Sequence, residues 1–181
     1  MAVLFLYFLL FLITTSLLII GGIFVVTYIL QQELFLHVPT LRTKHDDLSS
    51  LLSEGYISAK DIVYDLGSGN GQTLFLIEKQ KGAETHGIEL GITPSVFSRI
   101  LKKINSHRTT FYFKNLLTAD ISNATVIYAY LLPAVIVPLE KTIKERVKNG
   151  TTIILCDYPF TTLSPTKISQ HKRHTFYIYK I

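Results

Sequence analysis

Hydrophobic and polar positions divide this chain into one long apolar run followed by shorter, regularly alternating segments. From Ala2 to Leu30 there is no charged side chain, and every charged residue lies at or beyond Glu33. In the rest of the chain, short apolar runs alternate with stretches of helical periodicity, separated by glycine, proline and polar residues. Strands that alternate with helices predict an α/β fold with a doubly wound, mostly parallel, Rossmann-like sheet.

The apolar run Ala2–Leu30 predicts a membrane-spanning helix. At about 1.5 Å per residue it would be ~43 Å long, against a hydrocarbon core about 30 Å thick, so it spans once with tilt or breaks near Gly21-Gly22. A cleaved signal peptide would have a basic start, a shorter apolar core and a small-x-small cleavage site. The chain has none of these features. We therefore expect a retained transmembrane anchor over residues 1–32.

The charges that flank the anchor predict its orientation. Arg42 and Lys44 follow it on the carboxyl side, and no basic side chain precedes it. The positive-inside rule then places the following domain on the cytoplasmic side of the membrane, although Asp46 and Asp47 partly offset the two basic residues.

After the anchor we expect a connector and first helix over residues 33–55 and one catalytic domain over residues 56–181. Pro39 favours a helix start, with Thr40 as its N-cap and Gly55 as its stop. Pro94 is expected to open a later helix whose apolar residues share one face. The predicted strands are 61–65, 84–89, 109–113, 125–130 and 151–156; the later helices are 71–81, from Pro94 to about Ile104, and 133–147; a hairpin 166–170/174–181 closes the chain.

Composition limits the classes of partner. The single cysteine, Cys156, excludes an intramolecular disulfide framework and reads as a buried thiol. The six histidines show no metal-ligand spacing with an acid, so no metal is expected. The net charge of +5 suits an anionic membrane face, nucleic acid or an ordinary basic surface. Because no recognition helix, zinc spacing or arginine-rich tract is present, we expect no nucleic-acid partner.

The residues with the clearest chemistry form a glycine loop, Asp65-Leu66-Gly67-Ser68-Gly69-Asn70-Gly71. It follows the apolar run 62–64 and precedes the start of a helix. Glycines there let the backbone turn sharply and approach a ligand. Glu89 ends the next apolar stretch, where a carboxylate can accept two hydrogen bonds from a ribose diol. This layout is typical of a nucleotide-type pocket in a doubly wound sheet.

The spacing of the loop narrows the ligand. A dinucleotide fingerprint reads G-x-G-x-x-G, whereas these glycines fall at every second position, with Asp65 two residues before the first. A carboxylate at that place would repel a pyrophosphate but would suit an ammonium group. S-adenosylmethionine carries an α-amino group, a sulfonium and a ribose but no phosphate, so it is the expected cofactor. A dinucleotide site, or a tight turn beside an unrelated acid, is the alternative.

Further motifs support a narrower resemblance. They are Val38-Pro39-Thr40, the run from Asn123 to Pro133 with its Leu-Leu-Pro turn, and Cys156-Asp157-Tyr158-Pro159-Phe160. The chain resembles the membrane-anchored, seven-strand S-adenosylmethionine-dependent protein-lysine methyltransferases that, in mitochondria, modify the ATP synthase c-subunit and the adenine nucleotide translocator. It is even more similar to their prokaryotic relatives, over nearly its whole length.

The resemblance implies which residues contact the cofactor. Asp65 and the loop glycines would line its methionine part, Glu89 would hold the ribose hydroxyls, and Asn115 would lie near the adenine. Relatives often have aspartate at that last position, and Asp and Arg where this chain has Asn70 and Gln72. The full set of expected cofactor contacts is Thr40, Asp65, Gly67, Ser68, Gly69, Asn70, Gly71, Glu89, Asn115 and Leu116.

Two residues are the candidates for catalysis. Asp157 follows the fifth strand and Tyr130 the fourth, both at the carboxyl edge where ligands bind in such sheets. Asp157 is the first candidate for holding an incoming amine, and Tyr130 is the second. Alternatively, Asp157 caps a turn before Pro159, and one of Tyr128 and Tyr130 belongs to the core. The expected methyl acceptor is a lysine of a membrane-associated protein; a lipid or small amphiphile, or a non-catalytic module that only binds the cofactor, are the alternatives.

Overall fold

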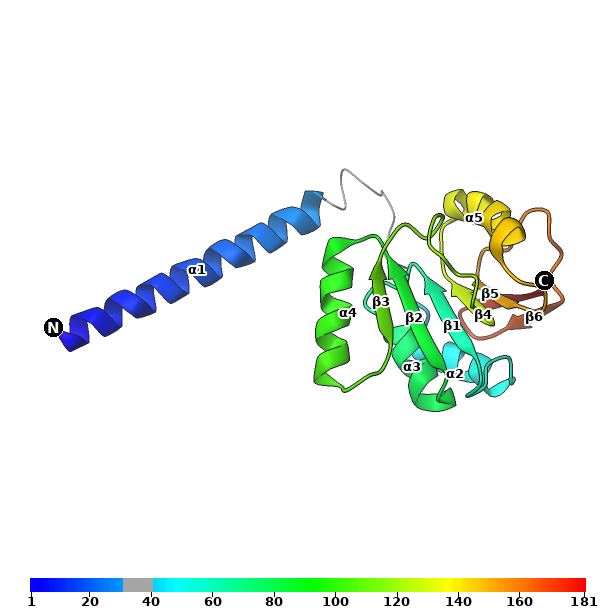
Figure 1. Cartoon of the computed structure of the whole chain (residues 1–181), viewed down its shortest axis with the longest axis horizontal. Helices are drawn as coiled ribbons and strands as arrows, with labels where there is room; N and C mark the ends of the chain where they lie inside the picture. Colours follow the sequence, from blue (N-terminus) through cyan, green and yellow to red (C-terminus); the bar gives the residue numbers. More distant parts are fainter. Residues whose placement is uncertain (31–40) are drawn as a thin grey trace. The chain divides into compact units, whose positions relative to one another are not determined.

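The chain divides into two compact units, Met1–Pro39 and Thr40–Ile181. The computed structural model (Figure 1) describes residues 1–30 and 41–181. The anchor, connector and domain boundaries expected from the sequence can therefore be followed only outside residues 31–40.

The first unit is a single helix, α1 (Ala2–Leu30). Its span Val3–Tyr28 is 26 residues long and apolar enough to cross a bilayer, a property that secretory signal sequences share. Hydroxyl groups within α1 donate to carbonyls one turn earlier, as from Thr27 to the Ile23 oxygen at 2.8 Å. These bonds satisfy the threonine hydroxyls of α1 without water, so they are compatible with an apolar surrounding.

A seven-stranded sheet of order β3-β2-β1-β4-β5-β7-β6 forms the second unit (Figure 1). Strands β1 to β5 are parallel, and β7 pairs antiparallel with both β5 and β6. The fold class predicted from the sequence is therefore confirmed. The strands are β1 (Ile62–Leu66), β2 (Glu84–Glu89), β3 (Thr110–Phe113), β4 (Val126–Ala129), β5 (Thr152–Cys156), β6 (Lys167–Gln170) and β7 (Thr175–Lys180).

Apolar side chains alternate between the two faces of the sheet, and each face has its own core. In β1, Val63 belongs to the core that includes helices α2 and α3, whereas Leu66 belongs to the core that includes α5. Parallel strands buried on both faces are expected for this architecture. The remaining helices are α2 (His45–Ser53), α3 (Gln72–Lys81), α4 (Ile92–Ile104) and α5 (Pro133–Arg146).

Helix α2 starts at His45, so the helix start predicted after a Thr40 N-cap is wrong. Lys44 is the N-cap residue, and its backbone is extended. Contacts with the sheet keep this segment from coiling: the Thr43 hydroxyl bonds the Tyr128 hydroxyl, and the Lys44 N–H donates to His174. Thr40 itself lies outside the described residues.

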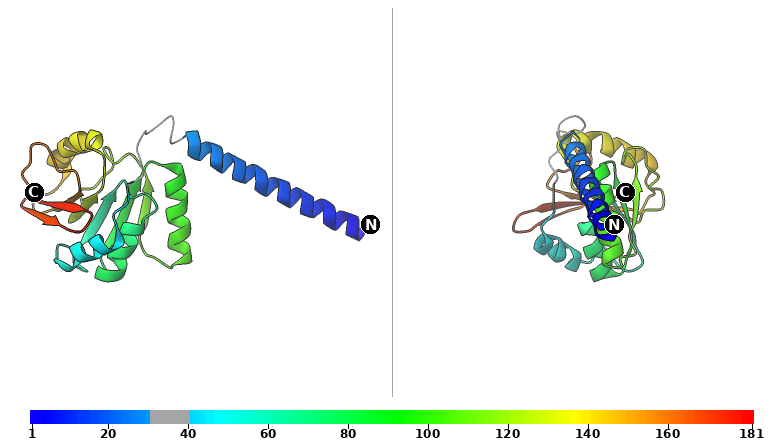
Figure 2. Two further views of the ribbon diagram at one scale, coloured as in Figure 1. Left: turned by 180° about the vertical axis from the view of Figure 1, so that it is seen from behind. Right: turned by 90° about the vertical axis from the view of Figure 1, so that its left-hand side faces the viewer.

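Helix α4 packs with an unexpected face. It lies beside edge strand β3, at the end of the sheet opposite hairpin β6–β7 (Figures 1 and 2). Its buried residues are Thr93, Ser95 and Ser98. The small side chains let the helix approach the strands closely, so the apolar row that the sequence places on this helix is largely left outside the core.

A buried carboxylate on α5 organises the loop that follows β5. Glu140 accepts the backbone N–H groups of Thr161, Thr162 and Leu163 at 2.8–3.0 Å. Burial alone would raise its pKa, but the bonds from these threonines and backbone groups outweigh burial and lower the pKa to about 2. The sequence offered no sign of this partner, because more than 20 residues separate the bonded groups.

Replacing Glu140 by Gln should destabilise the fold by about 2–4 kcal/mol at pH 7, since an amide accepts fewer and weaker bonds from the same loop. The pKa is depressed in the folded protein, so the contribution is present above about pH 4.5 and is lost as the pH falls toward 2. Denaturant unfolding at pH 7 and pH 3 measures both effects. An equal loss at the two pH values would contradict the assignment; Glu145→Gln, an exposed change on the same helix, is the control.

Candidate cofactor site and active site

The glycine loop runs from the carboxyl end of β1 into α3 and is held against β2. The N–H groups of Gly67 and Ser68 both donate to the Ile88 carbonyl, at 2.8 and 3.1 Å. Gly71 closes the loop with a φ of +82°, and a Cβ there would come within 2.4 Å of the Phe111 ring. Only glycine therefore fits this position without displacing the ring.

Glu89 closes the other side of the loop from the end of β2. Its two carboxylate oxygens accept the N–H groups of Gly69 at 2.8 Å and Gly91 at 2.6 Å. Gly69 has open space where a Cβ would lie. A half-buried carboxylate fixed beside open space retains lone pairs that can accept hydroxyl donors.

Asp65 has a buried carboxyl group with no hydrogen-bond partner among the described residues. The residue is 4% exposed, and burial and the charge of Glu89 are the influences on its carboxyl group. Burial, and then the charge of Glu89, raise its pKa to about 8. A buried acid in this state is poised to gain a cation, because a nearby positive charge favours the ionised form.

These features fit S-adenosylmethionine. The α-ammonium of the cofactor would supply the missing partner of Asp65, and its ribose diol would meet the free lone pairs of Glu89. Ser68 Oγ is likewise buried without a hydrogen-bond partner among the described residues. The loop of residues 65–71 carries no basic side chain, and its buried acid would repel a pyrophosphate, so these residues fit a cationic ligand better.

Asn115 lies just beyond β3, exposed, and its Oδ1 accepts the Leu117 N–H at 2.9 Å. The side chain therefore closes an Asx-type turn. This turn follows β3, the strand that pairs with β2. Leu116 is half-buried against the core. Contacts of Asn70, Asn115 and Leu116 with the cofactor remain predictions, as does any role of Thr40.

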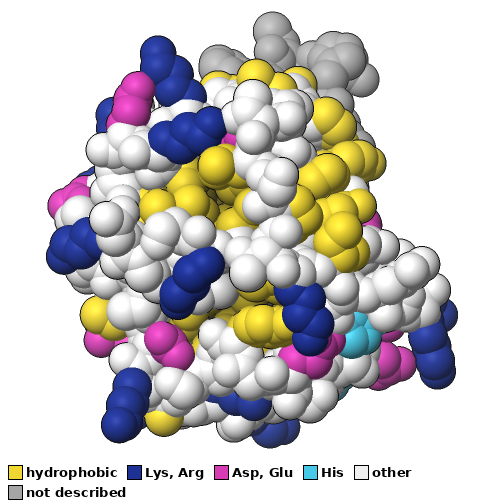
Figure 3. All heavy atoms as spheres, turned by 90° about the vertical axis from the view of Figure 1, so that its right-hand side faces the viewer, with side chains coloured by type: hydrophobic (Ala, Val, Ile, Leu, Met, Phe, Trp, Pro, Cys, Tyr) yellow, Lys and Arg dark blue, Asp and Glu magenta, His cyan; other side chains and the backbone are white. Residues whose placement is uncertain are grey.

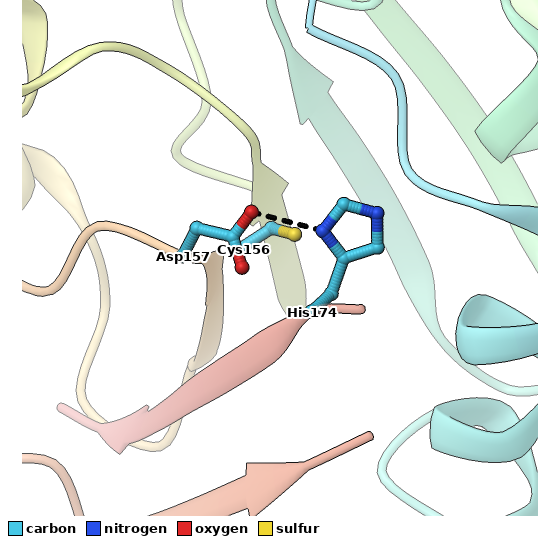
Figure 4. A group of neighbouring side chains, drawn as sticks. All are labelled: Cys156, Asp157 and His174. Atoms are coloured by element: carbon cyan, nitrogen blue, oxygen red, sulfur yellow. Dashed lines mark hydrogen bonds and ion pairs between the residues drawn. The ribbon is translucent and has the colours of Figure 1, made fainter. Parts of the chain in front are cut away.

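A second group of polar side chains gathers at the end of β5 (Figure 4). The His174 Nδ1 lies 2.9 Å from Asp157 Oδ2, and the Thr175 N–H donates to Asp157 Oδ1 at 3.0 Å. The Lys44 N–H donates to His174 Nε2 at 3.2 Å. Since Nε2 accepts, the proton of the neutral ring lies on Nδ1 and is donated to Asp157.

Tyr130 completes this group. Its ring meets the His174 ring edge-on, with centroids 5.4 Å apart. Burial, and then its hydrogen bond and repulsion with Asp157, raise the pKa of the Tyr130 hydroxyl, which therefore stays protonated. Burial opposes ionisation of Asp157, but hydrogen bonds from Tyr130, Thr175 and His174 outweigh it and lower the pKa. Asp157 is thus an ionised, oriented acceptor at neutral pH.

Cys156, Asp157 and His174 also present three possible metal-ligand atoms within 4.8 Å of one another. The hydrogen bonds already described account for the carboxylate and the imidazole. Burial strongly raises the pKa of the Cys156 thiol, and a neutral thiol is a poor metal ligand. The arrangement is therefore better described as an acid–histidine pair than as a metal centre.

Of the alternatives left open by the sequence, Tyr128 is the core residue: it is 1% exposed and bonded to Thr43. Asp157 has a φ of +62° and does more than cap a turn, because both its oxygens are used by other segments. His174 was missed as a site residue. The predicted hairpin places it at the start of the last strand, but only the antiparallel pairing of β7 with β5 brings it to Asp157.

A hollow on another part of the sheet edge does not coincide with the glycine loop. Its volume is about 380 Å³, and it is lined by Tyr64, Tyr112, Lys114 and Asp120, among others, but by neither Asp65 nor Glu89. We place the cofactor at the glycine loop instead, because buried unpartnered polar groups are a stronger sign of a ligand than volume alone.

The family model of the ANTKMT methyltransferase domain matches residues 65–167, which include the glycine loop, Glu89, Tyr130 and Asp157 but not His174. The chain belongs to this family. It is an S-adenosylmethionine-dependent methyltransferase, which confirms the activity and cofactor predicted from the glycine loop.

Relatives of this ANTKMT-type domain include lysine methyltransferases. A protein-lysine N-methyltransferase of Saccharolobus islandicus is 27% identical over 80% of this chain and 94% of its own length. The Xenopus laevis enzyme named as the lysine N-methyltransferase of the ATP synthase c-subunit is 25% identical to this chain. The matched region covers 80% of this chain and 63% of the Xenopus enzyme.

A solved structure with the same fold carries the cofactor product. The RNA methyltransferase of Salinibacter ruber, crystallised with S-adenosyl-L-homocysteine, is 28% identical, with a TM-score of 0.74 over 78% of this chain and 94% of its own. A methyltransferase of Thiobacillus denitrificans with the same ligand has a TM-score of 0.59 at 17% identity, over 77% of this chain and 58% of its own, and shows the fold alone.

Replacing Glu89 by Ala should weaken S-adenosylmethionine binding about 10- to 100-fold, because one bidentate acceptor and the brace on Gly69 are both lost. Isothermal titration calorimetry with S-adenosylhomocysteine measures the loss. Glu84→Ala, at the exposed opposite end of the same strand, is the matched control and should bind normally. Equal affinity of the Glu89 variant and the control would contradict the assigned ribose site.

Proposed function

We propose that this methyltransferase is a protein-lysine N-methyltransferase that acts on a membrane-associated protein. The observation that carries the proposal is the ionised Asp157, oriented by His174 and Tyr130, at the carboxyl edge of the sheet that also bears the glycine loop. The names of the two lysine methyltransferase relatives support it. The residues proposed for cofactor contact and catalysis are those named from the sequence, with His174 added as a positioning residue.

A lysine acceptor poses one chemical problem. Its ammonium has a pKa of about 10.4 in water, and only the neutral amine is a nucleophile. When bound, S-adenosylmethionine would supply the activated methyl group and a positive charge that disfavours a second cation nearby. The ammonium releases its proton to water as it enters the site, and Asp157 then accepts a hydrogen bond from the neutral amine and orients its lone pair. Holding the amine in line and away from bulk water provides most of the rate enhancement such a site can give.

Membrane attachment through α1 supports a target at the membrane. We propose residues 1–32 as a transmembrane anchor, 33–55 as connector and first helix, and 56–181 as the catalytic domain, held on the cytoplasmic side. Tethering raises the effective concentration of acceptors in the same membrane. The membrane and cytoplasmic placement rest on the apolar length of α1 and on Arg42 and Lys44.

Transfer of a radiolabelled methyl group into host membrane fractions tests the proposal. The full-length enzyme should label a protein band whose acid hydrolysate contains methyl-lysine, and Asp157→Asn should not. Label found in the lipid extract would favour a lipid or small-amphiphile acceptor instead. Label found in RNA, the substrate named for the Salinibacter relative, would overturn the lysine assignment, as would cofactor binding without any transfer.

A further inference from the structure

Helix α4 carries an apolar row that faces away from the sheet. Phe97, Ile100 and Ile104 are 52%, 49% and 72% exposed, and they follow one another at the three- and four-residue steps of one helix face. The opposite face is buried through Ser95 and Ser98. A contiguous row of exposed apolar side chains on a folded domain is typical of a surface that binds a membrane or another protein.

The charged side chains of the segment that contains this row have one sign, although one of them, Arg108, pairs with Glu78 on α3. Residues 90–119 contain five basic side chains and no acidic one: Arg99, Lys102, Lys103, Arg108 and Lys114. By contrast, residues 120–181 hold eight basic and four acidic side chains. On α4, Arg99 and Lys103 are exposed next to the apolar row. Apolar residues flanked by basic ones on a surface helix are typical of binding at a lipid interface.

We propose that the α4 face, defined by Phe97, Ile100, Ile104, Arg99 and Lys103, lies on the headgroup region of a bilayer that contains anionic lipid. The proposal rests on the membrane attachment proposed above. The ten residues between Leu30 and Leu41 can extend at most about 40 Å, so a spanning α1 would keep the domain within reach of the bilayer surface. The basic side chains would face the anionic headgroups, and the apolar row would enter the acyl boundary.

This contact would orient the active site. Helix α4 begins at Ile92, three residues beyond Glu89, so its amino end is fixed at the edge of the sheet where the cofactor binds. A domain lying on α4 would hold that edge about one helix diameter, ~10 Å, from the headgroups. Lysines that project a short way from the membrane would then be the accessible acceptors, whereas lysines on distant soluble domains would not.

The other end of the sheet offers a competing surface. Figure 3 shows hydrophobic side chains gathered in a hollow on the face that bears α5 and the C-terminal hairpin. There Val137 and Ile168 are 55% and 54% exposed. Because Ile168 matches Phe97 in exposure and lies at the opposite edge of the sheet (Figures 1 and 2), it provides a matched control.

The absence of tryptophan from the chain makes the test direct. Phe97→Trp and Ile168→Trp each create a single-tryptophan protein. The full chain of each is placed in nanodiscs of phosphatidylcholine with phosphatidylglycerol, with and without brominated acyl chains. We expect bromine to quench the fluorescence of Phe97→Trp at least twofold and to leave that of Ile168→Trp nearly unchanged. In the Phe97→Trp protein, adding Arg99→Glu and Lys103→Glu should relieve the quenching, whereas adding Lys141→Glu and Lys148→Glu on and after α5 should not.

The outcomes separate this inference from the function. No quenching of Phe97→Trp, or stronger quenching of Ile168→Trp, overturns docking through α4 even if lysine methylation is confirmed. In detergent, without lipid, a blue shift of the Trp fluorescence of Phe97→Trp that appears as the protein concentration rises would assign the face to a second copy of the chain. A blue shift that appears only when RNA is added would assign the face to nucleic acid. Either result overturns the proposal. A chain that does not enter the discs at all overturns the anchor together with the docking.

Discussion

Asp157→Asn should lower kcat for lysine methylation by about 100-fold or more while leaving the affinity for S-adenosylmethionine unchanged. The carboxylate is ionised and oriented by three groups at the end of β5, and none of those groups belongs to the glycine loop. The amide keeps the volume but loses the charge that receives the ammonium. Single-turnover kinetics with a methyl-lysine readout, together with calorimetry for the cofactor, measure the two effects separately.

The control for that variant is Asp120→Asn, an exposed acid in the loop after β3 whose carboxylate accepts the Ser122 N–H. It should retain near-normal kcat. His174→Ala should lower kcat about tenfold by freeing Asp157, and His174→Asn, whose amide can still donate, should restore part of the loss. A full loss of cofactor binding in Asp157→Asn would instead place this residue in the cofactor site and contradict the division proposed here.

The parts of the fold predicted best from the sequence are those fixed by local chemistry. Strand β2 has the predicted bounds, because Gly82 and the acid at position 89 delimit a short apolar run. The glycine loop can be predicted because Asp65 and Glu89 each end a short apolar run, and such runs mark the ends of strands in the sequence. The distribution of charged residues along the chain also distinguishes the long uncharged helix from the domain that follows it.

The parts that could not be predicted depend on contacts distant in the sequence. His174 reaches Asp157 only through the pairing of β7 with β5, and Glu140 finds its loop across 21 residues. Helix α2 begins late because Lys44 bonds a histidine 130 residues away. For α4, periodicity locates the apolar face correctly but does not say whether that face meets the core or the outside.

Asp65→Asn should abolish measurable binding of S-adenosylmethionine and, at the same time, stabilise the unliganded protein. The reason is that the Asp65 carboxyl group has no hydrogen-bond partner among the described residues, so the unliganded protein must fold with this carboxyl group protonated, which costs free energy above about pH 4. An amide of the same shape removes that opposition but cannot pair an ammonium group. A substitution that raises stability and removes binding is the signature of a residue retained for function at a cost to folding.

The sign of the pH dependence follows from the raised pKa. The folded, unliganded protein keeps the Asp65 proton up to about pH 8, whereas the unfolded chain releases it near pH 4. Stability contributed by this site is therefore lost as the pH rises from about 4 to 8. Because a tenfold change in proton affinity corresponds to about 1.4 kcal/mol, the Asn variant should exceed the wild type by a few kcal/mol at pH 8 and by about 1–2 kcal/mol at pH 5.

Asp61→Asn is the matched control, since it makes the same change just before the other end of β1. Burial there would raise the pKa of Asp61, but bonds from Ser58 and Thr125 outweigh it and lower the pKa, so this variant should be destabilised. Thermal unfolding at pH 5 and pH 8, with and without S-adenosylhomocysteine, measures all of these differences. The ligand should raise the Tm of the wild type and of Asp61→Asn but not that of Asp65→Asn. An Asp65→Asn protein that is less stable than the wild type at pH 8, or that still gains stability from the ligand, would mean that the buried carboxyl is a structural group and that the ammonium binds elsewhere.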